Sequence, residues 1–325
     1  MISDIVRDME RPRGVSIIVP TYNHEKYIAQ ALDSFLMQKT NFPIEILVHD
    51  DASTDSTADI LRDYAKRFPE IVKPVIQTEN QYSKGVNVEQ TFLMPKCRFS
   101  FTAMCDGDDY WTDDNKLQKQ VDALEEHPEI DICAHRAVAI NAETVNSEGY
   151  QGPADSFRIF TTEEVIDGDG GFVATGSIVY RTKLDEKIPE FRKINETDYG
   201  VQIDGSIRGG MLYFGDCMSA YRVSVAGSWT QRIIGNPEKA AAFFKTMDDM
   251  LVSLDSYTAG KYSTLIEKKR TENRFRLIEA RGNYREMFSS EFSEIMKSVS
   301  FKTKVKYRIG CLFPKLILER ERRKI

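Results

Sequence analysis

The chain has 325 residues, with 44 Lys and Arg against 50 Asp and Glu, which gives a formal net charge of −6. This length holds one large domain or two ordinary ones, and 41% hydrophobic residues exclude wholesale disorder. No apolar run approaches the roughly 20 residues of a membrane-spanning helix, and the acidic total argues against a nucleic-acid partner. The charged segment 1–13 lacks the apolar stretch of a secretory signal, and the five cysteines form no Cys-x-x-Cys pair. We therefore expect a reduced, cytoplasmic protein.

Short apolar runs alternate with helical patterns through the first half of the chain. Buried strands are predicted at 15–19, 44–48, 73–77, 99–105 and 130–134. Helices are predicted between them, at 28–36, 58–68 and 117–124, because apolar residues recur there at a spacing of three or four. This alternation predicts an α/β fold with a mostly parallel, Rossmann-like sheet and helices on both faces.

The second half of the chain is organised differently. Later strands are expected at 172–180 and 211–214, and long helices at 238–254 and 262–277. We therefore expect a nucleotide-binding and catalytic domain over 1–228, followed by a helical C-terminal region over 229–325.

Acidic side chains gather just beyond two of the predicted strands. Asp106, Asp108 and Asp109 follow one strand, and Asp50 and Asp51 follow another. Ligands of such sheets bind beyond the carboxyl ends of the strands. Three carboxylates within four positions repel one another unless a cation or solvent compensates, so a hard divalent cation that also binds phosphate is one interpretation. A solvated acidic turn is the other, and for the second cluster helix capping accounts for part of the pattern.

Several nucleotide-binding and hydrolase motifs are missing. The sequence has no Walker A loop, no Gly-x-Gly-x-x-Gly before the first helix and no Gly-x-Ser-x-Gly elbow. A dinucleotide oxidoreductase is therefore disfavoured.

Three segments occur together in one order and spacing. They are Val15–Asn23 (VSIIVPTYN), Ile46–Asp55 (ILVHDDASTD) and Asp106–Lys119 (DGDDYWTDDNKLQK). Together they resemble the family 2 glycosyltransferases with the GT-A fold, of the bacterial cell-surface polysaccharide type. The likeness covers roughly 15–229, where Met218–Trp229 resembles the closing segment of one bacterial branch.

The resemblance implies a nucleotide-binding set. Pro20 and Tyr22 would lie near the base, and Asp51 would read uracil. Lys84 lies in a loop that approaches the nucleotide in relatives. The donor implied is a nucleotide sugar, UDP-linked above all.

It also implies roles for the later acids. Asp106 would contact the ribose, Asp108 would hold Mn²⁺ or Mg²⁺ on the diphosphate, and Asp109 would support the site. Asp198 stands where the family carries its catalytic base. Two further residues are expected in support, Glu196 and His135, although a surface loop and a structural histidine are the simpler interpretations of these two.

The activity implied is an inverting, metal-dependent hexosyl or N-acetylhexosaminyl transfer to an acceptor hydroxyl, in surface polysaccharide or glycolipid synthesis. In this mechanism Asp198 takes the acceptor's proton. Two alternatives stay open. A sugar-phosphate nucleotidyltransferase shares the sheet and the cation but needs a Gly-rich phosphate loop, and a relative that only binds nucleotide sugars or carbohydrate would lack the base.

The C-terminal segment 297–325 is strongly basic. It holds ten Lys and Arg against two Glu, so its charge is +8 and the rest of the chain carries −14. Apolar residues are interleaved with these charges, and Pro314 should divide the segment into two short amphipathic pieces. We expect this tail to bind an anionic membrane, at the inner face of the plasma membrane where a lipid-linked acceptor would lie. The alternative is that its apolar side packs on the acidic body of the protein.

Overall fold

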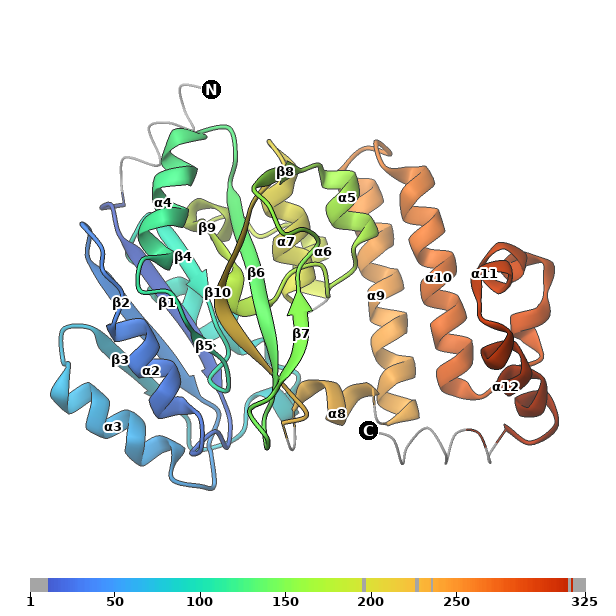
Figure 1. The fold of residues 1–325 in the computed structure, drawn as a ribbon, viewed down its shortest axis with the longest axis horizontal. Coiled ribbons are helices and arrows are strands. Elements are labelled where there is room, and N and C mark those ends of the chain that lie inside the picture. Colours follow the sequence, from blue (N-terminus) through green and yellow to red (C-terminus); the bar gives the residue numbers. More distant parts are fainter. Residues whose placement is uncertain (1–10, 195–196, 226–227, 235, 315–316, 318–325) are drawn as a thin grey trace. The chain divides into compact units, whose positions relative to one another are not determined.

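The computed structural model describes residues 11–194, 197–225, 228–234, 236–314 and 317. Within these ranges a β-sheet with its covering helices is followed along the chain by a series of helices (Figure 1). The contacts divide the chain into two compact units, the first made of Met1–Ile188 and Thr197–Val223 and the second of Pro189–Glu196 and Ser224–Ile325. The domain boundary expected at 228 stays a prediction.

The first unit contains all the described strands. These are β1 (Val15–Thr21), β2 (Ile44–Asp50), β3 (Val72–Ile76), β4 (Phe101–Met104), β5 (Tyr110–Trp111), β6 (Ile132–Asn141), β7 (Ser147–Gln151), β8 (Arg158–Phe160), β9 (Val179–Arg181) and β10 (Met211–Val223). Its helices are α2 (Ile28–Leu36), α3 (Thr57–Arg67), α4 (Lys116–Glu126), α5 (Thr162–Asp167) and α7 (Asp198–Ser206). Short helical turns include η1 (Tyr82–Lys84), η2 (Glu89–Leu93) and η4 (Thr175–Ser177).

The strands form one sheet in the order β3-β2-β1-β4-β9-β6-β10-β5, with β7 beside β6 and β8 beside β10. Strands β3, β2, β1 and β4 run parallel, as expected from their helical connections. Strand β9 is antiparallel to both of its neighbours, whereas β6 and β10 are parallel to each other. The predicted α/β class is therefore confirmed, with a sheet that is parallel at one end and mixed at the other.

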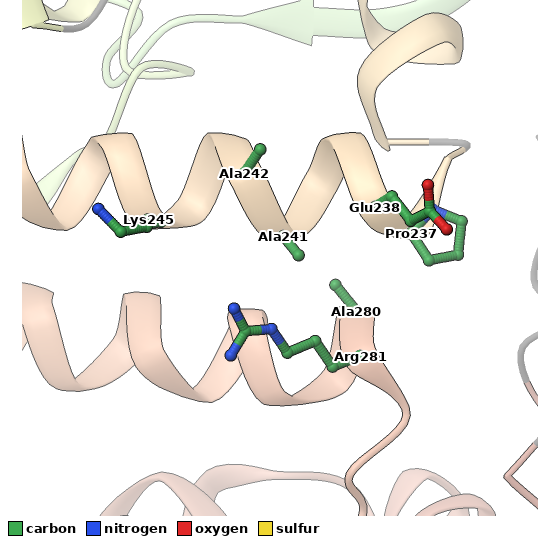
Figure 2. Close-up of a pocket in the computed structure, with 7 residues that line it drawn as sticks. All are labelled: Pro237, Glu238, Ala241, Ala242, Lys245, Ala280 and Arg281. Carbon is green, nitrogen blue, oxygen red and sulfur yellow. The ribbon is translucent and has the colours of Figure 1, made fainter.

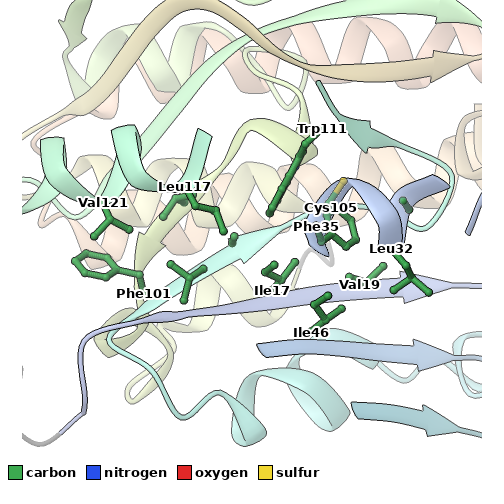
Figure 3. Close-up of a cluster of buried hydrophobic side chains, with 14 of the residues drawn as sticks. Ile17, Val19, Leu32, Phe35, Ile46, Phe101, Cys105, Trp111, Leu117 and Val121 are labelled. Carbon is green, nitrogen blue, oxygen red and sulfur yellow. The ribbon is translucent and has the colours of Figure 1, made fainter. Parts of the chain in front are cut away.

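A hydrophobic core lies between the sheet and helices α2, α3 and α4 (Figure 3). Ile17 and Val19 of β1 point into it, and Phe35 of α2 meets the ring of Trp111 edge-on, with centroids 4.6 Å apart. The Trp111 indole N–H donates to the Gly176 carbonyl at 2.8 Å, so its polar end is satisfied. This packing fixes the polypeptide directly after the Asp106–Asp109 cluster.

The opposite face of β1 and β2 is also buried, because the segment around η2 covers it. Ser16 is wholly buried there and donates to Glu45 at 2.7 Å. Arg98 pairs with the same carboxylate at 2.8 Å. Because β1 is buried on both faces, its sequence is a continuous apolar run, which is the pattern that predicted this strand.

One predicted strand is wrong over most of its length. Residues 172–180 were expected to be extended, but only Val179–Arg181 form β9, and Thr175–Ser177 form the turn η4. The turn is tight because the Ser177 hydroxyl donates to the Ala174 carbonyl, and Gly176 admits Cys105 and the Trp111 indole at close range. Apolar content predicted burial here correctly, but not the conformation.

The second unit is helical, as predicted. Its helices are α6 (Glu190–Ile194), α8 (Trp229–Ile234), α9 (Pro237–Tyr257), α10 (Ser263–Arg281), α11 (Ser293–Ser298) and α12 (Phe301–Leu312). Helices α9 and α10 pack side by side, joined by the ion pair of Arg270 with Asp248 at 3.0 Å. No helix within the described ranges is both long and apolar enough to cross a bilayer.

A groove of about 480 Å³ opens between α9 and α10, where alanines leave space between the helices (Figure 2). It is lined by Pro237, Glu238, Ala241, Ala242, Lys245, Ala280 and Arg281. With a single carboxylate, this lining lacks the clustered acids that predicted a cation and nucleotide site.

Replacing Phe35 by Ala should destabilise the first unit strongly. The side chain is wholly buried against Trp111, and truncating such a residue costs about 3–5 kcal/mol. Chemical denaturation followed by circular dichroism measures the change. Phe301→Ala is the matched control, because Phe301 is 80% exposed and surface changes stay within about 0.5 kcal/mol. Equal effects of the two substitutions would contradict this description of the core.

Candidate active site

The carboxyl ends of β1, β2 and β4 meet at one edge of the sheet. The Asp51 amide donates to the Thr21 carbonyl at 3.0 Å, and the Gly107 amide donates to the Pro20 carbonyl at 3.1 Å. These two bonds bring together the three segments singled out in the sequence. Each polar residue that follows a strand there is therefore part of one surface.

Asp106, Asp108 and Asp109 form a compact cluster. One carboxylate oxygen from each lies within 4.8 Å of those of the other two, and Asp109 is only 2% exposed. Burial, and next to it the charge of Asp108, raises the pKa of both Asp106 and Asp109 well above the usual range. Three clustered carboxylate oxygens are the ligand set of a hard divalent cation, so the residues present fit Mn²⁺ or Mg²⁺.

Gly107 is required by the close approach of this turn to β1. A Cβ at position 107 would lie 2.7 Å from the Thr21 hydroxyl and 2.9 Å from His24 Nδ1. The other ring nitrogen, His24 Nε2, lies 3.8 Å from a carboxylate oxygen of Asp108. His24 therefore faces the acidic cluster, a position that its sequence spacing did not indicate.

Arg222 on β10 is the principal cation next to the cluster. Its backbone N–H donates to Asp109 Oδ1 at 2.7 Å, and its guanidinium donates to the Asp108 carbonyl and, at 2.5 Å, to Gln30. The guanidinium also lies 4.8 Å from the ring centroids of both Tyr27 and Tyr110. This residue was missed in the sequence, where it stands 113 positions away from Asp109.

Asp51 is buried where the chain leaves β2. It is 4% exposed, and its carboxylate accepts the backbone N–H groups of Gln81 and Tyr82 at 2.7 and 3.1 Å. Asn80 donates to the Asp51 carbonyl at 3.0 Å. Asp51 therefore holds the turn that leads into η1. Lys84 in that turn forms an ion pair with Glu79.

Asp198 is the first residue of α7, at the helix N-terminus. The Thr175 hydroxyl donates to Asp198 Oδ2 at 2.7 Å. Burial raises the pKa of Asp198 to about 6, despite this hydrogen bond, which favours the ionised form. The charge of Asp198 also contributes to the raised pKa of Asp106, so the two carboxylates sense each other. Asp198 therefore lies close enough to the acidic cluster for its charge to act on Asp106.

The remaining candidates lie at different places. Pro20 and Tyr22 are partly buried at the end of β1 and in the turn beyond it. His135 lies within β6, wholly buried, with Nδ1 2.8 Å from the Arg136 carbonyl. Glu196 lies outside the described residues.

This arrangement, a nucleotide-binding type of α/β sheet with clustered aspartates at the carboxyl edge, defines the GT-A class of fold. It is similar to the crystal structure of Staphylococcus aureus TarS 1–349 in complex with UDP-GlcNAc, with a TM-score of 0.57 and 20% identity over 92% of this chain and 79% of that one. It is also similar to the mannosyltransferase PcManGT of Pyrobaculum calidifontis in complex with GDP-Man and Mn²⁺, with a TM-score of 0.55 and 18% identity over 96% of this chain and 86% of that one.

The sequence profile described as Glycosyl transferase family 2 matches residues 16–226, and the chain belongs to this family. It is 33% identical over 216 residues to an uncharacterized protein of Mycobacterium tuberculosis, which covers 66% of this chain and 60% of that protein. It is 36% identical over 112 residues to the putative teichuronic acid biosynthesis glycosyltransferase TuaG of Bacillus subtilis, over 34% of this chain and 42% of TuaG. The match thus spans about three fifths of the length of the first of these relatives.

Replacing Arg222 by Met should destabilise the site. The variant keeps an unbranched apolar stem but leaves the Asp108 carbonyl and Gln30 without their donor, and a buried group left unpaired costs about 1–3 kcal/mol. It also removes a positive charge next to three carboxylates, so the affinity for Mn²⁺ should rise. Denaturation and Mn²⁺ titration calorimetry measure the two effects. Arg158→Met is the control, because Arg158 pairs with Glu164 on an exposed surface. Equal losses of stability in the two variants would refute the role of Arg222.

Proposed function

We propose that this protein is an inverting glycosyltransferase that moves a sugar from a nucleotide donor to an acceptor hydroxyl. The observation that carries the proposal is the cluster of Asp106, Asp108 and Asp109 beyond the end of β4, together with Asp198, which Thr175 holds and whose charge acts on Asp106. The cluster provides a place for a cation and a diphosphate. Asp198 provides a base. An inverting transfer uses the base and the cation site together, and it proceeds without a covalent intermediate.

The donor that we propose is a UDP-linked hexose or N-acetylhexosamine. Support comes from the fold shared with TarS, a poly(ribitol-phosphate) β-N-acetylglucosaminyltransferase whose structures contain UDP and UDP-GlcNAc. Pro20, Tyr22 and Asp51 would surround the base, with Asp51 both accepting the uracil N–H and holding the turn at Gln81. Lys84 would approach the nucleotide after leaving Glu79.

We propose that Mn²⁺ or Mg²⁺ is held by Asp108, with Asp106 directed to the ribose and Asp109 in support. When bound, the cation would offset the charge that develops on the departing diphosphate. Arg222 would keep Asp108 and Asp109 in place through two hydrogen bonds, while a third holds its guanidinium on Gln30.

The chain's own proton chemistry rests on Asp198. An acceptor hydroxyl within hydrogen-bond distance of the carboxylate would lose its proton to Asp198 as it attacks the sugar. Thr175 orients the carboxylate by donating to Asp198 Oδ2, and the acceptor hydroxyl would donate to the same carboxylate. Glu196 and His135 are proposed only as supporting residues.

The acceptor that we propose is a glycan or a lipid-linked precursor of surface polysaccharide or glycolipid. TuaG, named for teichuronic acid biosynthesis, supports this class of product. The protein would then act in the cytoplasm, peripherally at the inner face of the plasma membrane.

Asp108→Asn should abolish the cation-dependent binding of UDP. When UDP is present at about 100 times its Kd, together with Mn²⁺, the wild-type protein should gain roughly 2.7 kcal/mol of stability. This gain is seen as a thermal shift. The variant should show no such gain, because it loses the charged cation ligand. Asp122→Asn on the exposed side of α4 is the control. An unchanged shift in Asp108→Asn would overturn the cation assignment, and consumption of a nucleoside triphosphate by the wild type would favour a nucleotidyltransferase.

Asp198→Asn should lower transfer by about 10²–10⁴, the usual contribution of general acid–base catalysis, while UDP binding survives. In the wild type the rate should rise as the pH increases through about 6, because the base works when deprotonated. Thr175→Val removes a hydrogen bond that stabilises the charged carboxylate, so this rise should move to higher pH. Rates at several pH values measure both effects, and a wild-type profile that is flat from pH 5 to 8 would exclude Asp198 as the base.

A further inference from the structure

Helix α12 has one side fixed to its own unit. Tyr307 is 4% exposed and packs against Phe275 and Tyr284, with ring centroids 5.9 and 6.0 Å away. Gly310 lies directly against the Tyr284 ring, where a Cβ would clash. This side of the helix therefore packs within the C-terminal unit, through Phe275 and Tyr284.

The other side of α12 is apolar and exposed. Phe301, Val305, Ile309 and Leu312 have exposed fractions of 80%, 38%, 42% and 71%. At about 100° per residue these four side chains lie within an arc of about 80°. Phe313, which is 59% exposed, follows directly. We call these five residues the apolar stripe.

Basic residues border the stripe on both sides. By the same helical geometry, Lys302 and Lys306 lie along one border and Lys304 and Arg308 along the other, and the helix contains no acid. Lys306 pairs with Glu279 at 3.0 Å. Lys302, Lys304 and Arg308 form no ion pair with any residue that the structure describes, so their charge is available to a partner.

We propose that the apolar stripe and its basic borders are a docking surface for an anionic lipid bilayer. A helix that lies in the bilayer interface buries an apolar face and presents Lys and Arg to anionic head groups on either side. A second copy of the chain fits less well, because a symmetric contact through the stripe would bring the four cations of each helix close to those of the other.

The packing of α12 keeps the apolar stripe exposed. Tyr307 and Gly310 fix the roll of the helix, so the stripe cannot turn inward without losing the packing against Tyr284. Bilayer binding rests on the peripheral location proposed above and is measured without any donor. Its failure would remove that location but leave the proposed transfer reaction untouched.

The test is co-sedimentation of the full chain with phosphatidylcholine vesicles, with and without phosphatidylglycerol. The wild type should pellet with the anionic vesicles and be released by salt. Phe301→Ser/Leu312→Ser and Lys302→Gln/Arg308→Gln should each bind at least roughly tenfold more weakly, since apolar burial and charge both contribute to interfacial binding. All four side chains are exposed, and the UDP thermal shift of each variant should equal that of the wild type.

Val252→Ser/Lys268→Gln is the matched control. Val252 on α9 is 44% exposed, and the side chain of Lys268 on α10 is 56% exposed. The control should pellet like the wild type. Equal pelleting of the wild type and both stripe variants, or no pelleting of the wild type, would overturn the proposal. A wild-type dimer in light scattering that the stripe variants lose, without vesicle binding, would assign the stripe to self-association instead.

Discussion

Repulsion among three carboxylates is the constraint around which the first unit is arranged. Carboxylate oxygens of Asp106, Asp108 and Asp109 lie within 4.8 Å of one another beyond the end of β4, and burial makes the charges of Asp106 and Asp109 costly. The protein offsets part of this cost with Arg222, which reaches the turn from β10 and is itself enclosed by two tyrosine rings. A cation bound there, as proposed above, would offset the rest.

A second feature of the site is the way in which β2 organises a distant turn. Asp51 uses its carboxylate to bind two backbone N–H groups of residues 81 and 82. Such charge-assisted bonds are about twice as strong as neutral ones, so the turn is held firmly at the sheet edge. The nucleotide contact proposed for Asp51 would share the carboxylate with these bonds, and it would couple donor binding to the conformation of the turn.

The C-terminal unit combines packing and exposure in one helix. The aromatic cluster of Phe275, Tyr284 and Tyr307 holds α12 from one side, while Phe301 and Leu312 remain in solvent on the other. Exposed apolar residues flanked by unpaired cations are unusual on a surface that meets only water. The structure shows packing for one side of α12, and membrane binding by the exposed side is our proposal.

The sequence by itself determined the elements that depend on local periodicity. Strand β1 is a continuous β-branched run, α2 has its apolar residues at helical spacing, and Asp106 follows a strand, so all three were predictable from neighbours in the chain. The motifs around Asp51 and Asp106 also predicted the family. Tertiary structure alone decided the contacts between distant segments. Arg222 meets Asp109 across 113 positions, Gln81 covers Asp51 across 30, and the turn at Thr175 replaces a strand because Trp111 and Cys105 occupy the space beside it. A sequence pattern records which residues prefer burial, but the partner that buries them is set by packing between elements far apart in the chain.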